Sequence, residues 1–402
     1  MKILLHTQWF DPEPTFKGLL FARALRDAGH EVEVLTGFPN YPSGKVYDGY
    51  KISYYKKECI DGIIVHRVPL YPSHDSSSFK RALNYISFCI SSFLLGLIKC
   101  RNVDVIYSYH PPLTTSLSSV FIGFLKRVPV VLDIQDLWPD TLSATGMINN
   151  KKVLKVIGVA CKVTYKMSSR IVVLSPGFKS RLISYGVPEN KINIIYNWCD
   201  EQAVTHFQTC DSKLPDNNKL NLLFAGNMGF AQGLPAIVMA AELLKKKNIP
   251  VNIVLLGDGV GKNHAIEMAQ EIELDNIYFI PRVPMSEVGS LLSTSDILLV
   301  HLNDNDLFKI TIPSRTQSNL AIGKPIIMGV AGDAADLVKK SGAGLVCEPN
   351  NPESLAAAIT TMAEMSPEDR NAMGLAGKKF YYDNLSLDKG VEKFISIFKD
   401  IV

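Results

Sequence analysis

A repeated alternation of short apolar segments, Gly- or Pro-containing loops and amphipathic helical segments constrains the fold of this chain more than any other feature. Short strands that alternate with helical patterns are typical of βαβ units, in which right-handed crossovers build a parallel sheet. In the first half of the chain, strands are expected at residues 2–6, 31–35, 63–69, 103–109, 128–134, 171–174 and 192–196.

The alternation stops once, at residues 197–219, which are polar and contain the sequence LPDNNK. It then resumes, and further strands are expected at residues 220–225, 251–257, 277–280, 296–301, 325–328 and 343–347. We therefore predict an α/β protein of two Rossmann-like doubly wound domains, 1–197 and 198–384, that face each other across a cleft. Ligands of such sheets bind at the carboxyl ends of the strands.

Cysteine usage and the N-terminus indicate a cytoplasmic protein. The seven cysteines are scattered and form no CxxC pair, which argues for reduced thiols and against a disulfide framework or a zinc site. The N-terminal sequence MKILLHTQWF has one lysine and a short apolar run, so we interpret it as a first strand and not as a signal peptide.

The charge distribution is uneven. Residues 1–200 carry 24 Lys and Arg against 15 Asp and Glu, whereas residues 201–402 carry 18 against 24. A basic first half predicts an anionic partner, such as a membrane surface, a lipid diphosphate or a nucleic acid. The chain has no arginine-rich run and no interleaved aromatic residues, so we do not expect a nucleic acid partner.

Residues 82–99 contain the apolar sequence ISFCISSFLLGLI, flanked by basic residues on both sides. The apolar core is short for a membrane span and contains serines. Two interpretations remain: a buried or interdomain helix, and a helix that lies in the membrane interface. A second basic stretch either forms a solvated helix face or lies against anionic headgroups, and it contains Lys151, Lys152, Lys155, Lys162, Lys166 and Arg170. We expect peripheral association with the inner membrane.

Two glycine-containing loops each join an expected strand to a helical segment. A glycine at a helix N-terminus lets a phosphate approach bare N–H groups. The first loop, residues 11–18, ends at Gly18, and a plain turn explains it equally well. The second loop, GNMGFAQG at residues 226–233, suits a diphosphate. It lacks the GxGxxG spacing, which disfavours a nicotinamide enzyme, and it lacks GK[ST], which excludes a P-loop.

Two arginines follow expected strands of the second half. Pro313-Ser314 can begin a helix with Arg315 in its first turn, where a guanidinium binds phosphate oxygens bidentately. Arg282, followed by Val283, could line a pocket for a nucleotide base. The alternative for each arginine is an ordinary surface side chain.

The segment DIQDLWPD, residues 133–140, leaves the carboxyl end of an expected strand. We expect Asp136 to point into the cleft, where a carboxylate can position an acceptor hydroxyl or accept its proton, with Trp138 shaping the wall. The alternative is that Asp136 caps a turn. His110, also directly after a strand, is a further candidate on the acceptor side.

Residues 304–306, Asp-Asn-Asp, resemble a metal-binding DxD motif. A solvated acidic turn explains them as well, and the histidines show no spacing typical of a metal site. We predict no metal site.

These loops together resemble the family 4 retaining glycosyltransferases of the GT-B architecture over nearly the whole chain. The motifs that carry the resemblance are FDPEP before Gly18, QDLWP at 135–139, AGNMGFAQGL at 225–234, LLGDG at 255–259 and IPSRTQSNLAIGKPI at 312–326. The chain resembles in particular bacterial O-antigen and capsule transferases, including N-acetyl-L-fucosaminyl transferases. The resemblance implies a GT-B fold whose final helix, at about 385–402, packs back on the first domain.

The resemblance also implies roles for individual residues. Arg315 and Asp136 would be catalytic, Arg282 and Val283 would meet the base, and Gly18 would approach the phosphates from the first domain. The remaining donor-binding positions that it implies are Gly226, Asn227, Gly229, Gln232, Gly233, Thr311, Ser314 and Ser318. Trp138 and His110 would lie on the acceptor side.

One departure from the family pattern concerns two carboxylates. Many relatives carry two glutamates eight positions apart, the second five residues before a Gly-x-Pro. Gly323-Lys324-Pro325 places these positions at Ile310 and Ser318, so both carboxylates are missing. The donor ribose must be held by other groups, and a 6-deoxy sugar would tolerate the apolar Ile310 nearby.

The expected function is transfer, with retention, of a sugar from a nucleotide-sugar donor to a sugar on undecaprenyl diphosphate, in O-antigen, lipopolysaccharide or capsular polysaccharide synthesis. The expected donor is UDP-linked, for example UDP-N-acetyl-L-fucosamine or a related N-acetylated hexosamine. No cofactor is implied beyond this co-substrate. The alternatives are a nucleotide-sugar epimerase on the same architecture and a non-catalytic sugar or lipid binder.

Overall fold

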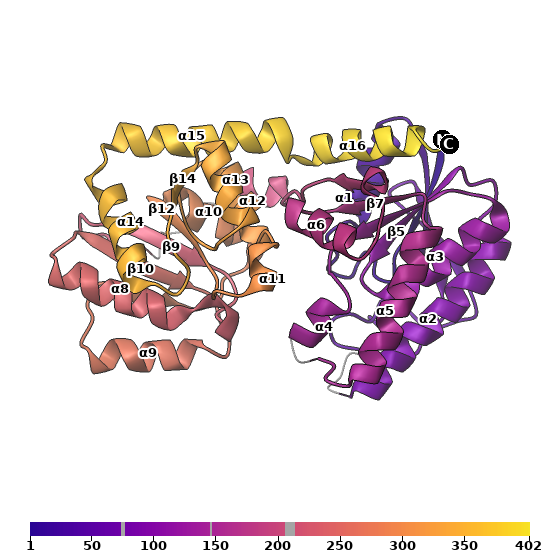
Figure 1. The fold of residues 1–402 in the computed structure, drawn as a ribbon, viewed down its shortest axis with the longest axis horizontal. Helices are drawn as coiled ribbons and strands as arrows, with labels where there is room; N and C mark the ends of the chain where they lie inside the picture. The colour runs from indigo at the N-terminus through magenta and orange to yellow at the C-terminus, as the bar shows by residue number, and fades with distance from the viewer. Residues whose placement is uncertain (74–76, 145–146, 206–213) are drawn as a thin grey trace. The chain divides into compact units, whose positions relative to one another are not determined.

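The computed structural model describes residues 1–73, 77–144, 147–205 and 214–402 (Figure 1). Contacts between residues divide the chain into two compact units. Unit 1 comprises Met1–Ile195 and Val391–Val402, and unit 2 comprises Tyr196–Gly390. Residues 206–213 of the expected polar linker lie outside the described residues.

Unit 1 is built on an eight-stranded sheet with the strand order β3-β4-β2-β1-β5-β6-β7-β8. All neighbouring strands pair in parallel except β3 and β4. The strands are β1 (Lys2–His6), β2 (Glu31–Gly37), β3 (Lys56–Ile60), β4 (Ile63–Val68), β5 (Val105–His110), β6 (Val130–Ile134), β7 (Arg170–Val173) and β8 (Ile192–Ile194). The strand order reverses direction between β1 and β5, which makes this the switch point of the sheet.

The helices of unit 1 connect these strands. They are α1 (Leu19–Asp27), α2 (Ser78–Lys99), α3 (Leu113–Lys126), α4 (Asp140–Ala144), α5 (Lys151–Met167), α6 (Pro176–Ser184) and the short η1 (Glu189–Lys191). Local sequence fixes several starts, since the side chains of Asn150 and Ser175 accept hydrogen bonds from the first turns of α5 and α6.

The last helix of the chain, α16 (Leu387–Lys399), brings the C-terminal residues into unit 1. Phe394 is fully buried, and its ring lies 5.2 Å from the ring of Phe21 and 5.6 Å from that of Tyr107, measured between centroids. The core of unit 1 therefore contains side chains from both ends of the sequence.

Unit 2 is built on a six-stranded sheet, β11-β10-β9-β12-β13-β14, in which every pair is parallel. Its strands are β9 (Leu220–Ala225), β10 (Val251–Leu256), β11 (Ile277–Ile280), β12 (Ile297–His301), β13 (Ile326–Gly329) and β14 (Gly344–Val346). The direction of the strand order reverses between β9 and β12, so ligands are expected at the carboxyl ends of these two strands.

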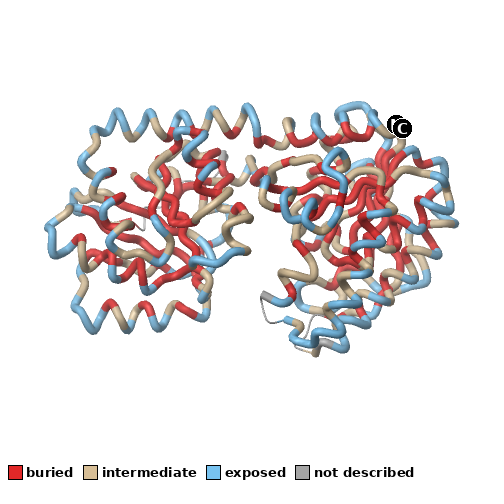
Figure 2. Tube along the Cα trace, viewed as in Figure 1, coloured by how far each residue is buried: buried red, intermediate tan, exposed pale blue. Residues whose placement is uncertain are grey.

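Helices cover both faces of the unit 2 sheet, and the strands are buried between them (Figure 2). One face packs against α8 (Leu234–Lys246), α9 (Lys262–Glu271) and α14 (Pro352–Glu364). The other packs against α10 (Met285–Thr294), α12 (Ser314–Ile322), α13 (Asp333–Ser341) and α15 (Pro367–Asn384). The remaining short elements are α7 (Glu201–Thr205), η2 (Phe230–Gln232) and α11 (Asp306–Lys309).

The predicted fold class is confirmed: the chain forms two α/β domains, each with a doubly wound sheet that is parallel apart from the edge strand β3 of unit 1. The strands were predictable because a strand that is buried on both faces of a sheet has a continuous run of apolar residues.

Candidate functional site

The predicted glycine loop of unit 2 joins β9 to α8, directly at the switch point of the sheet. The loop after β10 supports it. Gly226 N donates to Leu256 O at 2.9 Å, and Met228 N donates to Asp258 O at 2.8 Å. A Cβ on Gly257 would lie 1.9 Å from Gly226 O, so only glycine allows this approach of the two backbones. The LLGDG motif thus holds the glycine loop in place.

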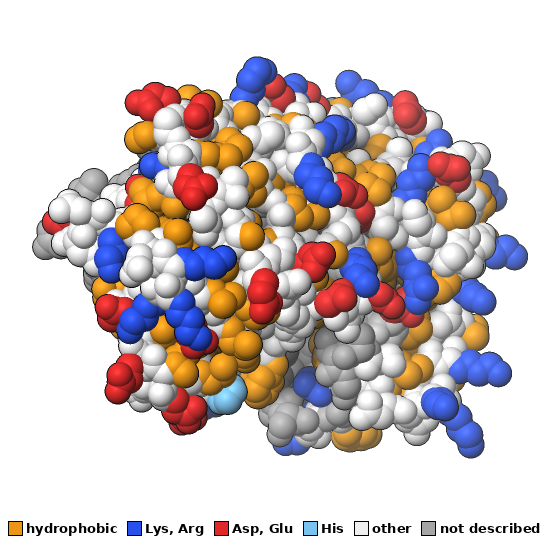
Figure 3. All heavy atoms as spheres, turned by 60° about the vertical axis from the view of Figure 1, so that its left-hand side comes forward, with side chains coloured by type: hydrophobic (Ala, Val, Ile, Leu, Met, Phe, Trp, Pro, Cys, Tyr) orange, Lys and Arg blue, Asp and Glu red, His pale blue; other side chains and the backbone are white. Residues whose placement is uncertain are grey.

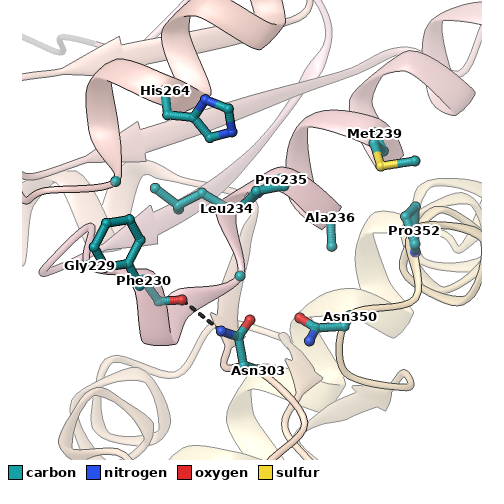
Figure 4. Close-up of a pocket in the computed structure, with 12 residues that line it drawn as sticks. Gly229, Phe230, Leu234, Pro235, Ala236, Met239, His264, Asn303, Asn350 and Pro352 are labelled. Atoms are coloured by element: carbon teal, nitrogen blue, oxygen red, sulfur yellow. Dashed lines mark hydrogen bonds between the residues drawn. The ribbon is translucent and has the colours of Figure 1, made fainter. Parts of the chain in front are cut away.

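The loop ends at Gly233, which takes a left-handed conformation with φ +62° before α8 begins. Polar side chains surround this helix start. A Cβ on Gly233 would lie within 2.7 to 2.8 Å of atoms of Asn303, Asn350 and His301. Asn303 Nδ2 donates to Phe230 O at 2.7 Å, and this bond is visible in Figure 4.

A pocket of about 520 Å³ opens beside the N-terminus of α8 (Figure 4). Its wall combines the apolar side chains of Phe230, Leu234 and Met239 with the polar ends of Asn303 and Asn350. Apolar walls with a few placed polar groups are typical of small-molecule sites.

Arg315 lies in the first turn of α12, as expected from the Pro313-Ser314 start. Its guanidinium carbon is 4.4 Å from the centroid of the Phe224 ring and 3.3 Å from the position of a Cβ on Gly226. Nη1 is inaccessible to solvent and has no hydrogen-bond partner, and no carboxylate among the described residues forms an ion pair with this side chain. Burial lowers the pKa of Arg315 to about 10.

A half-buried guanidinium that lies over the Phe224 ring is costly, because its charge has lost water and gained no hydrogen bond or counter-ion from the described residues. An anion bound at this position would supply the missing charge and accept hydrogen bonds in the fork geometry of the guanidinium. Arg315 lies in the first turn of α12, and the N-terminus of this helix also favours a negatively charged ligand.

Two hydrogen-bond acceptors near Arg315 are also buried without partners, Gln232 Oε1 and His301 Nε2. His301 Nδ1 lies 2.8 Å from the carbonyl oxygen of Gln232, which can only accept, so Nδ1 carries the proton. Burial lowers the pKa of His301, and the charge of Arg315 lowers it further. The imidazole is therefore neutral, and Nε2 offers a lone pair to a donor such as a hydroxyl.

The other predicted donor-side residues occupy varied positions. Arg282 is exposed after β11, whereas the side chain of Val283 is buried in the core with Leu291, which leaves only its backbone to meet a ligand. Thr311 Oγ1 donates to Leu307 O at 2.6 Å. Ser314 is exposed at the start of α12, and Ser318 is half-buried one turn further on.

The side chains of the acidic segment at the start of α11 interact with residues of the same segment. Asp304 and Asp306 each lie 3.2 Å from Lys309 Nζ, and Asn305 caps the helix by accepting from Leu307 N at 2.9 Å. Among residues 1–73, 77–144, 147–205 and 214–402, no group of three or more His, Cys, Asp or Glu side chains is arranged to hold a metal ion.

In unit 1, the predicted acceptor-side residues come together at the ends of β5 and β6. The rings of His110 and Trp138 meet edge to face at 5.8 Å between centroids. Burial lowers the pKa of His110 to about 4, and its Nε2 has no partner. Asp136, in the same loop, is half-buried, and burial raises its pKa to about 6.

Gly18 precedes α1, but a carboxylate of the protein already lies at this helix start. Asp11 Oδ2 accepts from Leu19 N at 2.7 Å and lies 2.3 Å from the position of a Cβ on Gly18. The first N–H group of α1 is therefore occupied in this structure.

A charged cluster in the core of unit 1 was not predicted from the sequence. Lys17 and Asp133, both fully buried, form an ion pair, and Tyr107 donates its hydroxyl to Asp133 Oδ2 at 2.5 Å. Burial lowers the pKa of Lys17, and Asp133 opposes that effect. The available signal was a charged residue inside an otherwise apolar strand, since Asp133 belongs to β6.

Comparisons with known proteins match both halves. A model for the "Glycosyl transferase 4-like domain" matches residues 19–198, and a model for "Glycosyl transferases group 1" matches residues 208–380. The chain belongs to the group 1 glycosyltransferases. The transferase is 29% identical over 378 residues to the "Putative colanic acid biosynthesis glycosyl transferase WcaI" of Escherichia coli K12, a match that covers 89% of this chain and 91% of that protein.

A second relative is the "Probable glycosyltransferase WbjE" of Pseudomonas aeruginosa, 23% identical over 311 residues and 76% of each protein. Solved structures share the fold of the transferase. A glycosyltransferase from Rickettsia africae has a TM-score of 0.67 at 16% identity and covers 100% of this chain and 98% of its own. Anabaena HepE in complex with UDP has a TM-score of 0.67 at 13% identity and covers 100% of both chains. The expected GT-B fold is confirmed.

Proposed function

We propose that the transferase moves a sugar from a UDP-sugar to a lipid-linked saccharide during assembly of a bacterial surface polysaccharide. The observation that carries the proposal is the half-buried guanidinium of Arg315, which has no hydrogen-bond or ion-pair partner among the described residues and lies against the glycine loop after β9. The relatives support the choice of reaction: one is named for colanic acid biosynthesis, and HepE of similar fold was solved with UDP and with UDP-glucose.

Arg315 and the N-terminus of α12 neutralise the donor diphosphate in this proposal. As the bond between the sugar C1 and the phosphate oxygen breaks, its electron pair stays on that oxygen, where a fixed cation and helix N–H groups stabilise the growing charge. The acceptor oxygen forms the new bond to C1, and its proton passes to the departing phosphate. The sugar keeps its anomeric configuration.

The two hydrogen-bond acceptors near Arg315 support a nucleotide-sugar substrate that carries hydroxyl groups. Gln232 Oε1 and neutral His301 Nε2 are buried acceptors without partners, and hydroxyl groups of a sugar or ribose would donate to them. They offer one route by which the transferase binds its donor without the two glutamates missing at Ile310 and Ser318.

On unit 1, we place the acceptor at the loop that contains Asp136. A carboxylate whose pKa is about 6 is ionised at neutral pH and can orient the acceptor hydroxyl by accepting its hydrogen. His110 and Trp138 support this loop by their ring contact. The acceptor proposed is a sugar on undecaprenyl diphosphate.

For the donor sugar we propose a 6-deoxy N-acetylated hexosamine, with UDP-N-acetyl-L-fucosamine as the first candidate. The apolar side chain of Ile310 stands where many relatives have a carboxylate, which favours a methyl group over a hydroxyl. Turnover that prefers the 6-hydroxylated analogue would contradict this assignment.

The decisive experiment measures donor consumption and product formation with a panel of UDP-, GDP- and TDP-sugars and a lipid-linked N-acetylhexosamine. Transfer that requires both substrates, with the anomeric configuration of the product read by NMR, supports the proposal. Conversion of the donor without acceptor would indicate an epimerase. Donor binding with neither transfer nor hydrolysis would indicate a non-catalytic binder.

A further inference from the structure

Helix α2 presents an apolar surface to solvent. Its exposed hydrophobic side chains recur at intervals of three or four residues and therefore form one stripe along the helix. The stripe consists of Phe79 (77% exposed), Leu83 (38%), Ile86 (51%), Ile90 (57%), Leu94 (53%) and Ile98 (52%). A helix on the surface of a soluble domain normally turns its polar side outward.

The buried side of α2 combines the apolar side chains of Phe88 and Leu95 with polar ones. Buried Asn84 accepts from Gln8 Nε2 at 2.6 Å and donates to Tyr71 O at 2.7 Å. Buried Ser92 lies 3.0 Å from the hydroxyl of Ser118 on α3. Because these hydrogen bonds fix which side faces inward, the exposed apolar stripe is a stable feature of the fold.

The stripe continues across two neighbouring helices. Figure 1 shows α3 beside α2 and α5, and contacts between residues join α3 to both. On α3, Phe121, Phe124 and Leu125 are 42%, 71% and 58% exposed. On α5, the valines 153, 156, 159 and 163 are 37% to 69% exposed, and an apolar groove of about 620 Å³ separates the two helices. We call these residues and the stripe of α2 the α2–α3–α5 face.

The charged side chains of these three helices are all basic, since none of the helices contains an Asp or Glu, and Lys152 and Lys155 line the groove itself. The exposed basic residues on or next to these helices are Lys80, Lys99, Arg101, Arg127, Lys151, Lys152, Lys155, Lys162 and Lys166. Figure 3 shows a face of a different kind, on which acidic and basic side chains are interspersed.

We propose that the α2–α3–α5 face docks on the surface of an anionic phospholipid bilayer. Its apolar side chains would enter the headgroup region while the lysines contact lipid phosphates. By length and composition α2 could cross a membrane, but Asn84 and Ser92 bind its inner side to the domain, so it lies along the surface. A symmetric pair of copies would oppose one lysine-rich face to another, which disfavours a dimer through this face.

The test compares vesicle flotation of the full chain on phosphatidylcholine alone and on phosphatidylcholine with about 30% phosphatidylglycerol. The test variant is Ile90→Asp/Phe124→Asp/Val156→Asp, which changes one exposed residue on each helix. The matched control is Tyr54→Asp/Ile272→Asp/Leu375→Asp, whose residues are 74%, 39% and 54% exposed elsewhere on the chain.

We expect the unmodified chain to float with the anionic vesicles and to bind neutral vesicles at least about tenfold more weakly. The test variant should lose at least about tenfold in anionic-vesicle binding, and the control variant should match the unmodified chain. Higher salt should weaken binding, because it screens the lysines. Circular dichroism melts of all proteins identify any variant that fails to fold.

A second measurement stays decisive if the triple variant unfolds. In Phe124→Trp the new indole should be quenched by brominated lipids, over the background of the native tryptophans, and in Leu375→Trp it should not. Lack of anionic-vesicle binding by the unmodified chain, or equal quenching at both positions, would overturn the proposal. So would a dimer, seen by light scattering, that the test variant dissociates. None of these readouts requires donor binding.

Discussion

Arg315→Met should raise the stability of the protein while it abolishes most of its activity. Methionine keeps an apolar stem over the ring of Phe224 but removes the charge. Burial lowers the pKa of Arg315 from 12.5 to about 10, which corresponds to about 3 kcal/mol of lost solvation at 1.36 kcal/mol per pKa unit. Since the side chain keeps some exposure, a gain of about 1–3 kcal/mol in the free energy of unfolding is expected.

The catalytic loss follows from the proposed contact with the diphosphate. Removal of one donor to a developing oxyanion lowers turnover by about 10²–10³-fold. For a domain the size of unit 2, each kcal/mol shifts the melting temperature by about 2–4 °C. The assay combines thermal melts with and without UDP and steady-state kinetics with the donor. UDP should raise the melting temperature of the unmodified enzyme and have little effect on the variant.

Arg370→Met is the matched control in unit 2. Its guanidinium donates to Met362 O at 3.2 Å and Met365 O at 2.5 Å, so its loss should cost about 1 kcal/mol and leave turnover unchanged. If Arg315→Met instead melts below the unmodified enzyme and keeps its turnover, then Arg315 is a structural arginine and the donor site lies elsewhere.

Three further outcomes are expected. The kcat/KM of the unmodified enzyme should fall as the pH drops through about 6, because Asp136 gains a proton, and Asp136→Asn should lose this pH dependence. Because burial raises the pKa of Asp136 from 3.8 to about 6, its ionisation also lowers the free energy of unfolding as the pH rises from about 4 to 6. Urea melts of Asp136→Asn should lack this contribution to the pH dependence of stability. Lys17→Met should destabilise unit 1 by about 3–5 kcal/mol in urea, because Asp133 keeps a buried charge. Lys17→Met/Asp133→Asn should recover much of the loss, because the amide removes the charge and still accepts from Tyr107, and equal stability of the two variants would contradict an ion pair. Product formation should be unchanged by EDTA and by the double substitution Asp304→Ala/Asp306→Ala. The reason is that both carboxylates pair with Lys309, and Arg315 supplies the positive charge for the diphosphate. A large loss of product in both experiments would indicate a metal site at these residues.

The parallel strands were predictable because burial on both faces gives each of them a continuous apolar run. Strand β9 matches its expected bounds, and β5 begins two residues later than expected because Val103 is buried without joining the ladder. Strand β3 was missed. It is an edge strand that begins with three consecutive charged residues, KKE, so it has neither an apolar run nor an apolar–polar alternation. Its only sequence signal was the Asp61-Gly62 turn, where both residues take positive φ.

Parts of the candidate site were equally predictable. A Pro-Ser start placed Arg315 in the first turn of α12, and glycines marked the loop before α8. The partnerless state of His301 and Gln232 could not be read from the sequence, because it depends on which atoms the fold brings together. The same holds for α2, whose apolar residues were evident although the direction in which they point was not.

The return of α16 has a consequence for synthesis on the ribosome. Unit 2 is one continuous segment, so it can close its core as soon as Gly390 has left the exit tunnel. Unit 1 begins at Met1 but still lacks Phe394 at that moment, and its ring fills a space between Phe21 and Tyr107. The domain that is translated first is therefore completed last, and a released chain truncated after Gly390 should contain a folded second domain and an unfinished first one.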